Sequence, residues 1–368
     1  MNHRPEFEIK ISGRKVAMGN RTLIMGVLNV TPDSFSDGGR YLDPVRAVQR
    51  GVELARQGAD WIDVGGESTR PGSQPVAAEE ELRRVLPVIR GLRQKLRDVP
   101  ISIDTTKAEV AEQALRVGAD ILNDVSGLRF DLRLAEVAHR HRAPLVLMHL
   151  RGRPVTMQRQ PFPRNIWRSL ANGFETSIRR ALTAGVERSQ LILDPGFGFG
   201  KSRRQNYEIL AGLDRLQHFH LPLLIGASRK SFVQAIVAGE GLDPTPAQRP
   251  GAHYWPIAGS HRNESARRNS RKENSALLLT GDAAVVVAAI LDGAHIVRVH
   301  DPGAILPAVR VADALLAALR SHALGSVKVA GVAYLQGHEY ITREETSSPT
   351  ALRWVRGPFQ SHWTLMEF

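Results

Sequence analysis

The chain has 368 residues, with 49 Lys or Arg against 37 Asp or Glu, which gives a formal net charge of +12 at pH 7. It contains no cysteine, which excludes disulfide scaffolds, thiolate metal sites and cysteine nucleophiles. The longest uninterrupted apolar run spans only residues 283–291, and the first residues lack the apolar stretch of a signal peptide. We therefore expect a folded cytoplasmic protein without a membrane-spanning segment.

Residues 4–20 read RPEFEIKISGRKVAMGN, in which apolar and polar residues alternate on both sides of Ser12-Gly13. Alternation with a period of two is typical of a strand with one buried face, and Ser-Gly favours a tight turn. The sequence therefore predicts an N-terminal hairpin within residues 1–20, ahead of the main domain.

Beyond residue 20, short apolar runs alternate with amphipathic helical stretches, as expected for parallel strands that are covered on both faces. The predicted strands span residues 22–30, 61–66, 101–105, 121–125, 144–149, 191–195, 221–227 and 295–300. Helical patterns lie between them, for example over residues 44–57, 79–96, 107–116, 132–140 and 169–184. Eight such units in a row favour an α/β fold of the (β/α)8 TIM-barrel type over an open sheet, although the count alone allows both.

Polar or ionisable residues stand at or near the end of each predicted strand. In a barrel the carboxyl ends of the strands form one rim, which is where active sites are built. One such residue is usually a helix cap, but a whole ring of them indicates a site. The residues are Asn29, Asp63, Asp104, Asn123, His149, Asp194, Ser228, Arg298 and His300.

Two later segments break the alternation. Residues from about 241 to 280 are rich in Pro, Gly, Ser, Asn and Arg, which predicts an irregular basic loop insertion before the last β/α unit. A loop that follows a barrel helix usually lies at the amino-terminal face, so we expect this insertion far from the strand-end residues. Residues 326–368 form a C-terminal extension of unknown role, which leaves residues 21–325 for the barrel.

Several strand-end stretches resemble dihydropteroate synthase, a family of pterin-binding enzymes in the folate pathway. They occur in the family's order over about residues 20–325, and eight motifs in order are far more specific than any one of them. The stretches are MGVLNVTPDSFSDGG (25–39), IDVGGESTRPGS (62–73), ISIDTTK (101–107), ILNDVSG (121–127), LMH (147–149), ILDPGFGFGK (192–201), IGASRKS (225–231) and GAHIVRVHD (293–301).

The resemblance implies a transferase that joins 6-hydroxymethyl-7,8-dihydropterin diphosphate to 4-aminobenzoate. The products would be 7,8-dihydropteroate and diphosphate, and Mg²⁺ would be the cofactor. The resemblance also implies a homodimer, with small-molecule substrates as the other partners and no membrane partner.

The pterin ring carries N–H donors and a carbonyl acceptor along one edge, so a site that reads it needs buried carboxylate and amide groups. By resemblance, the pterin-binding residues are Asp104, Asn123, Asp194 and Lys230. Asp194 is the best candidate acceptor for paired N–H groups, and Lys230 can donate to the ring oxygen and nitrogen.

The diphosphate leaving group needs cations and donors where negative charge develops. Arg298 and His300 alternate on the last strand, so their side chains project to the same side. By resemblance they bind the diphosphate together with Asn29 and Arg70, and Asn29 is also the Mg²⁺ ligand. The catalytic residues implied in this way are Asp104, Lys230, Arg298 and His300.

The aminobenzoate pocket implied by the resemblance draws on two Gly- and Ser-rich loops that can act as lids, residues 31–40 and 68–74. Its residues are Phe35, Thr69, Pro71, Phe199 and Ser231.

Three other functions compete with this interpretation. A pterin-dependent methyltransferase domain would share the barrel, but it would not need Arg298 and His300 for a diphosphate. A catalytically silent pterin-binding paralogue would use the insertion and the extension to bind partners. The positive charge also suggests a nucleic-acid partner, but the sequence carries no recognised nucleic-acid-binding module, so we do not expect one.

Overall fold

The computed structural model describes residues 4–31, 43–69, 72–158, 163–243, 264–325, 333–334, 339–345 and 352–358, with side chains except at 264–275 and 321–358. The chain divides into two compact units, residues 1–313 and 314–368.

All eight predicted parallel strands lie in one sheet of the first unit. The eight strands form seven neighbouring pairs, all parallel, in the order β8-β7-β6-β5-β4-β3-β10-β9. The backbone of Leu193 closes the ring by bridging to Leu223 and donating to the Pro222 carbonyl at 2.9 Å. The predicted (β/α)8 barrel is therefore confirmed. Its strands are β3 (Leu23–Asn29), β4 (Trp61–Gly65), β5 (Ile101–Asp104), β6 (Ile121–Asp124), β7 (Leu145–Met148), β8 (Leu191–Asp194), β9 (Leu224–Ile225) and β10 (Ile296–Val299).

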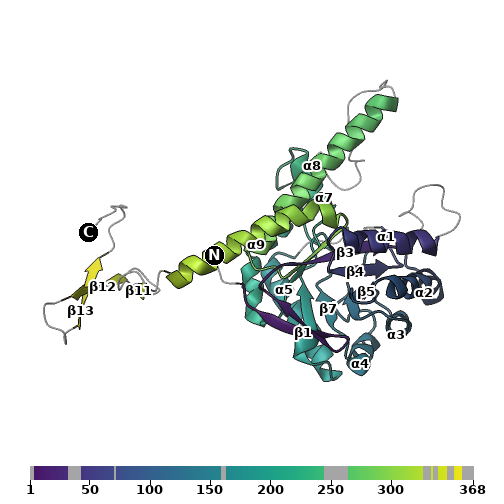
Figure 1. The fold of residues 1–368 in the computed structure, drawn as a ribbon, viewed down its shortest axis with the longest axis horizontal. Helices are drawn as coiled ribbons and strands as arrows, with labels where there is room; N and C mark the ends of the chain where they lie inside the picture. Colours follow the sequence, from purple (N-terminus) through teal and green to yellow (C-terminus); the bar gives the residue numbers. More distant parts are fainter. Residues whose placement is uncertain are drawn as a thin grey trace. The chain divides into compact units, whose positions relative to one another are not determined.

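Helices cover the outer face of the barrel (Figure 1). Gly58, Gly118 and Gly293 each end a helix with φ of 100°, 119° and 107°, a left-handed conformation that costs glycine little, and the next strand follows within three residues. The helices are α1 (Pro44–Arg56), α2 (Ala78–Lys95), α3 (Ala108–Arg116), α4 (Arg133–His141), α5 (Ile166–Thr183), α6 (Arg203–Leu210), α7 (Ser231–Val237), α8 (Glu264–Leu291) and α9 (Pro302–Gly325), with short 3₁₀ helices η2 (Arg188–Gln190) and η3 (Leu213–Phe219).

The predicted N-terminal hairpin closes the amino-terminal end of the barrel. Strands β1 (Phe7–Ile11) and β2 (Arg14–Met18) pair antiparallel around Ser12-Gly13. Ile9, Ile11 and Met18 are buried in one cluster with side chains from the barrel strands, among them Trp61 of β4. This apolar plug fills the amino-terminal end, so the opposite end of the strands is left to bind ligands.

His295, directly before β10, joins the N-terminal segment to the barrel. The fully buried imidazole accepts a hydrogen bond from the Leu223 N–H at Nδ1 (3.1 Å), so Nε2 carries the proton and donates to the Pro5 carbonyl at 2.9 Å. Burial lowers the pKa of His295 to about 4, and nearby Arg4 lowers it further while the bond to Pro5 opposes the shift. The ring is therefore neutral in the folded protein at pH 7.

We expect His295 to make the fold sensitive to acid. The unfolded chain binds a proton at an ordinary histidine pKa near 6.5, whereas the folded chain resists protonation until about pH 4. The free energy of unfolding should thus fall by up to about 3 kcal/mol from this residue between pH 6.5 and 4. The test variant is His295→Asn, which keeps an acceptor for the Leu223 N–H. Its free energy of unfolding in urea should change less between pH 6.5 and 4 than that of wild type or of a variant of the exposed His218. An equally steep curve for His295→Asn would contradict the assignment.

The segment predicted as an irregular insertion, about 241–280, differs from that expectation in two ways. Residues from Glu264 onward belong to helix α8, so the part from 264 to 280 is helical. The start of the segment also lies at the carboxyl-terminal rim, because Arg203 and Arg204 in the first turn of α6 pair with Glu240 and Asp243. Residues 244–263 lie outside the described residues.

The short length of α7 explains the rim position. Its seven residues rise only about 10 Å, so α7 ends close to the carboxyl-terminal rim. Helix α8 then makes the return to the amino-terminal face and leads into β10. Our expectation that the insertion lies at the amino-terminal face, far from the strand-end residues, is therefore wrong for residues 241–243.

The second unit carries a three-stranded antiparallel sheet beyond the end of α9. Its strands are β11 (Ala333–Tyr334), β12 (Glu339–Glu345) and β13 (Leu352–Pro358), in that order. Strand β12 pairs with β13 from Glu339↔Pro358 to Glu345↔Leu352. Part of the C-terminal extension therefore forms regular structure, and its role is open.

Among the described residues, one helical segment, Pro302–Arg320 in α9, is long and apolar enough to cross a membrane by length and composition alone. Ile305, Val309 and Ala312 are nevertheless buried at spacings of four and three residues. This spacing is typical of a helix that packs one face against a protein core.

Candidate active site

A buried ionic cluster occupies the carboxyl-terminal end of the barrel. Arg298 of β10 donates from Nε to Asp63 Oδ2 at 2.6 Å and from Nη2 to Asp104 Oδ2 at 2.9 Å. Asn123 of β6 donates from Nδ2 to the same Asp63 oxygen at 3.1 Å. Three predicted site residues from strands far apart in the sequence therefore meet around Asp63, whose other oxygen has no hydrogen-bond partner among the described residues.

Asp63 is a site residue to which the sequence assigned no role. It stands at a strand end like the predicted residues, and that position was the only signal for it. Its side chain is fully buried, and without Arg298 and Asn123 its charge would be uncompensated. This carboxylate therefore orients both neighbours toward the centre of the barrel mouth.

Burial changes the proton affinity of two predicted pterin-binding carboxyl groups. It raises the pKa of Asp104 above its usual range, while Arg298 opposes the shift and Asp63 adds to it. It also raises the pKa of Asp194 to about 6, against the Gly196 N–H and nearby cations. A ligand that donates hydrogen bonds to these groups favours their ionised forms, so its binding is expected to release protons.

Asp194 and Lys230 are positioned by neighbouring turns on the same rim. Asp194 Oδ1 accepts from the Gly196 N–H at 2.7 Å, at the start of the loop that follows β8. Lys230 directly precedes α7, and its Nζ lies 4.0 Å from the centroid of the Phe199 ring. A cation and an aromatic face from two loops therefore meet beside the buried carboxylate.

Two glycines leave room above the strands for a ligand. A Cβ at Gly65 would lie 3.6 Å from Asn29 Oδ1 and 3.6 Å from Asp104 Cβ. A Cβ at Gly226 would lie 3.8 Å from Asp194 Oδ2 and from Arg298 Cβ. Because glycine has no side chain, space is left between Asn29 and Asp104 at Gly65 and between Asp194 and Arg298 at Gly226.

Asn29 and Asp104 also provide oxygen atoms on either side of Gly65. No group of three or more His, Asp or Glu that could hold a metal is found within the described residues. Mg²⁺ commonly keeps several waters and binds one or two protein oxygens plus substrate phosphates. The donor set around Asn29 therefore fits a Mg²⁺ ion that is held largely by a phosphorylated substrate.

Lys107 anchors the base of the loop after β4. Its Nζ lies between the carboxylates of Glu67 and the fully buried Glu81 of α2, and Arg84 donates to the Gly66 carbonyl at 2.8 Å. Thr69, two residues beyond Glu67, is half-buried at the end of this described stretch. The predicted site residues Phe35, Arg70 and Pro71 lie outside the described residues.

Lys201 anchors the loop after β8, another function that the sequence did not reveal. Its buried ammonium donates to the carbonyls of His149 (2.9 Å), Gly196 (2.8 Å) and Phe199 (3.1 Å). Burial lowers the pKa of Lys201 to about 7, and Asp194 opposes the shift. The lysine thus holds in place the loop that carries Phe199.

The remaining two predicted residues lie on the rim beside Lys230. His300, half-buried just after β10, has Nδ1 3.3 Å from Ser228 Oγ. Ser231 is exposed at the first position of α7.

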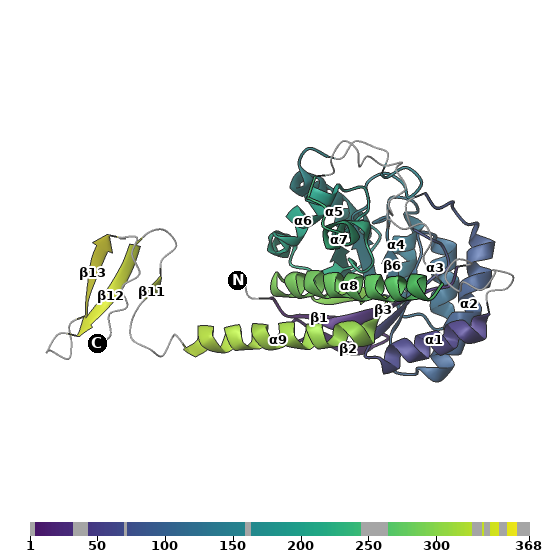
Figure 2. The ribbon, with the colours of Figure 1, turned by 90° about the horizontal axis from the view of Figure 1, so that it is seen from above.

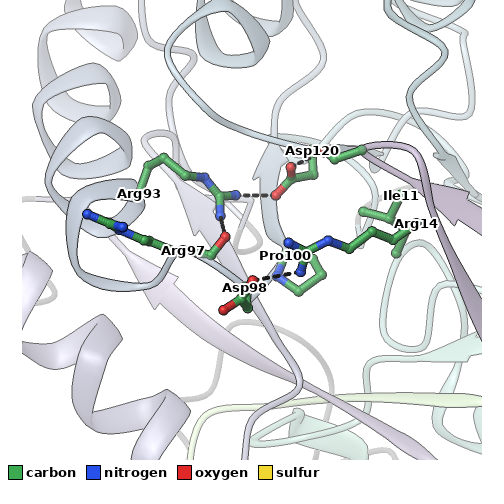
Figure 3. Close-up of a pocket in the computed structure, with 8 residues that line it drawn as sticks. Ile11, Arg14, Arg93, Arg97, Asp98, Pro100 and Asp120 are labelled. Atoms are coloured by element: carbon green, nitrogen blue, oxygen red, sulfur yellow. Dashed lines mark hydrogen bonds and ion pairs between the residues drawn. The ribbon is translucent and has the colours of Figure 1, made fainter.

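A cavity of about 300 Å³ lies at the other end of the barrel, between the hairpin and the amino ends of β5 and β6 (Figure 3). Arg93 pairs there with Asp120, and Arg14 donates to Asp98 at 2.7 Å. The cavity contains none of the predicted site residues, and its carboxylates are matched by these arginines. We therefore assign it to the structural closure of the barrel.

The profile of the pterin binding enzyme family matches residues 25–300 of this chain. A dihydropteroate synthase from Synechocystis is 43% identical over 298 residues, which cover 81% of this chain and 91% of the relative. The structure of the Yersinia pestis dihydropteroate synthase with a sulfonamide drug complex has a TM-score of 0.70 and 36% identity, and the match covers 85% of this chain and all of that one.

A further solved structure, the Xanthomonas albilineans dihydropteroate synthase with 4-aminobenzoic acid, has a TM-score of 0.69 and 35% identity. The match covers 85% of this chain and 99% of that one. The family profile, the relatives and the solved structures agree with the strand-end motifs and with the barrel that carries them. The chain therefore belongs to the dihydropteroate synthases, the pterin-binding transferases of folate biosynthesis.

Proposed function

We propose that the buried cluster at the carboxyl end of the barrel binds the pterin of 6-hydroxymethyl-7,8-dihydropterin diphosphate. The meeting of Arg298, Asp63, Asp104 and Asn123 at hydrogen-bond distance is the observation that carries this proposal. Asp194 accepts the ring N–H groups, and Lys230 donates to the ring oxygen and nitrogen. Asp104 and Asn123 provide the remaining hydrogen-bonding groups for the polar edge of the pterin ring.

The diphosphate binds, in this proposal, above the same cluster, where Arg298, His300 and Asn29 supply positive charge and donors, and we assign Arg70 to the same site from its sequence motif. Asn29 would hold Mg²⁺, which neutralises charge on the phosphate oxygens when bound. Arg298 and His300 lie on the same strand end, so they can stabilise charge that builds on the leaving oxygen.

The 4-aminobenzoate binds beside the pterin, between the rim loops. Phe199 is buried next to Lys230, and Ser231 opens α7 nearby, which supports their place in this pocket. We assign Thr69, Phe35 and Pro71 to the same pocket from the sequence motifs. An apolar ring between aromatic and small polar side chains is a common way to hold a substituted benzoate.

The reaction needs no nucleophilic side chain. The C–O bond to diphosphate breaks with its electron pair on the leaving oxygen, and the electron-rich dihydropterin stabilises the cationic methylene. The amine nitrogen of 4-aminobenzoate then forms the C–N bond and loses a proton. The residues of this chain serve to align the two substrates, exclude water and stabilise the diphosphate.

The test is a turnover assay of the purified full chain with the pterin diphosphate, 4-aminobenzoate and Mg²⁺. We expect dihydropteroate and diphosphate in equal amounts, and no turnover after chelation. Asn29→Ala should require a higher Mg²⁺ concentration for half-maximal rate, because it removes the proposed protein ligand. Pterin binding without turnover would support the silent paralogue, and an unchanged Mg²⁺ requirement in Asn29→Ala would refute the ligand assignment.

We also propose a cytoplasmic homodimer. Leu277 of α8 and Val311 of α9 are 56% and 60% exposed. Both helices lie on the outer side of the barrel strands (Figure 2). Exposed apolar side chains on outer helices favour association with a second copy. Light scattering should give twice the chain mass of 40.5 kDa, and a charged residue at Leu277 should reduce it toward one chain.

A further inference from the structure

Asp282 of α8 is a buried carboxylate, 4% exposed, whose contacts lie at the rim of the active site. It accepts a hydrogen bond from Ser228 Oγ at 2.9 Å and from the Arg229 backbone N–H at 2.9 and 3.1 Å to its two oxygens. Helix α8 comes this close because of Gly281, where a Cβ would lie 2.5 Å from Val237 of α7. All of these bonds go to one short turn between β9 and α7.

The turn held by Asp282 has an unusual backbone conformation. Arg229 has a φ of +59°, in the left-handed region that non-glycine residues rarely adopt because the side chain crowds the backbone there. The bonds from Asp282 to Ser228 and Arg229 stabilise this conformation locally. The turn directs the next residue, Lys230, to the position 4.0 Å from the Phe199 ring.

Ser228 also connects Asp282 to His300. A serine hydroxyl has one proton, and Ser228 donates it to Asp282, so its remaining capacity is to accept. His300 Nδ1, 3.3 Å from Ser228 Oγ, is therefore the donor in that contact. The chain of bonds fixes the ring orientation and the protonated Nδ1 of His300.

Other charged groups surround this chain of bonds without replacing Asp282. Arg229 donates from Nη2 to Asp301 Oδ2 at 2.6 Å, and Arg50 donates to the His300 carbonyl at 3.3 Å. Neither contact reaches the Ser228 hydroxyl or the Arg229 N–H. Asp282 is thus the acceptor on which both groups depend among the described residues.

We propose that Asp282 is a positioning residue for the dihydropteroate synthase reaction. It acts through Ser228 on His300 and through the Arg229 turn on Lys230, and it does not touch the substrates itself. The inference rests on the roles proposed above for His300 and Lys230. Asp282 lies on a helix and outside the strand-end motifs, so no sequence motif assigns it a role in the site.

Asp282→Asn is the primary test. An asparagine keeps one acceptor oxygen but loses the negative charge, and its NH2 group replaces one of the two oxygens that now share the Arg229 N–H, so the bonds to the turn are weakened. We expect kcat/KM for the pterin diphosphate to fall about 10- to 100-fold in folded protein, as for the loss of a charged hydrogen bond. Ser228→Ala removes only the hydroxyl and should also lower kcat/KM. It provides the test if Asp282→Asn does not fold.

Asp292→Asn is the matched control. Asp292 directly follows the last residue of α8, at the end of the helix remote from the rim, and accepts the Leu213 N–H at 2.7 Å. This variant should lower the melting temperature to a similar degree and leave kcat/KM within about twofold of wild type. An Asp282→Asn enzyme with the kinetics of Asp292→Asn, once both are corrected for folded protein by circular dichroism, would overturn the proposal.

A double-mutant cycle separates positioning from stability. If Asp282 acts through His300, Asp282→Asn should lower kcat/KM by a smaller factor in a His300→Ala background than in wild type. The proposal would be overturned if Asp282→Asn lowered kcat/KM by the same factor in the His300→Ala and Lys230→Ala backgrounds as in wild type. Failure of the underlying roles has a different signature, because His300→Ala and Lys230→Ala would then turn over at the wild-type rate.

Discussion

Replacing Arg298 by alanine is expected to lower turnover about 100- to 1,000-fold and to destabilise the fold by about 3–5 kcal/mol. The rate falls because the proposed diphosphate site loses its buried cation. The stability falls because Asp63 and Asp104, which Arg298 now joins at 2.6 and 2.9 Å, would be buried without a positively charged partner. Steady-state kinetics and urea unfolding measure the two effects separately.

Two variants sharpen the Arg298 experiment. Arg298→Lys keeps the charge but has a single nitrogen, so it cannot reach Asp63 and Asp104 in the same way and should give intermediate values for both effects. Arg93→Met removes another partly buried arginine, which pairs with Asp120 at the opposite end of the barrel, and should lose stability only. A turnover rate of Arg298→Ala within tenfold of wild type, per folded molecule, would show that Arg298 has no part in the chemistry.

Replacing Asp194 by asparagine is expected to weaken pterin binding by about 1,000-fold or more while the fold remains intact. The amide oxygen can still accept from the Gly196 N–H, which Asp194 now does at 2.7 Å. The NH2 group then stands where the ring N–H donors need an acceptor, and a site built for hydrogen bonds discriminates strongly against an unpaired group. Calorimetric titration with a pterin measures the loss directly.

The matched control for Asp194 is Asp124→Asn. Asp124 ends strand β6, which β7 separates from β8, and burial raises its pKa to about 6, as it does for Asp194. Its oxygens, however, accept the backbone N–H groups of Ser126 and Leu128, so they are turned into the protein. This variant should lose stability and keep its pterin affinity. Equal pterin affinities of the two variants would refute the role of Asp194.

The strand-end residues show how far a sequence can predict a site. Burial on both faces makes parallel strands visible as apolar runs, and their carboxyl ends must meet on one rim. This reasoning places Asp104, Asn123 and Asp194 together, and the structure does bring Asp104 and Asn123 to Arg298 and Asp63. The sequence does not reveal which oxygen accepts from which donor, because those pairs join β10 to β4 and β5, strands that are distant along the chain.

The insertion before α8 shows where such reasoning fails. Gly, Pro and Arg indicate an irregular segment, but residues from 264 onward continue a helix whose later turns are held by packing. Buried Val285, Val286, Ala289 and Ile290 anchor α8 against the barrel. Local composition reports the intrinsic preference of a segment, whereas tertiary packing decides how far a helix extends.

The sequence by itself determined the absence of cysteine chemistry, the (β/α)8 order of elements and the ring of polar strand ends. These follow from residue type and periodicity, which are local properties of the chain. Only the tertiary structure decided that Asp63 binds Arg298, that Lys201 anchors the loop of Phe199 and that Asp282 on a helix supports the turn of Lys230. Each of these contacts joins residues distant in sequence through burial, and a buried charge must find its partner wherever the fold places one.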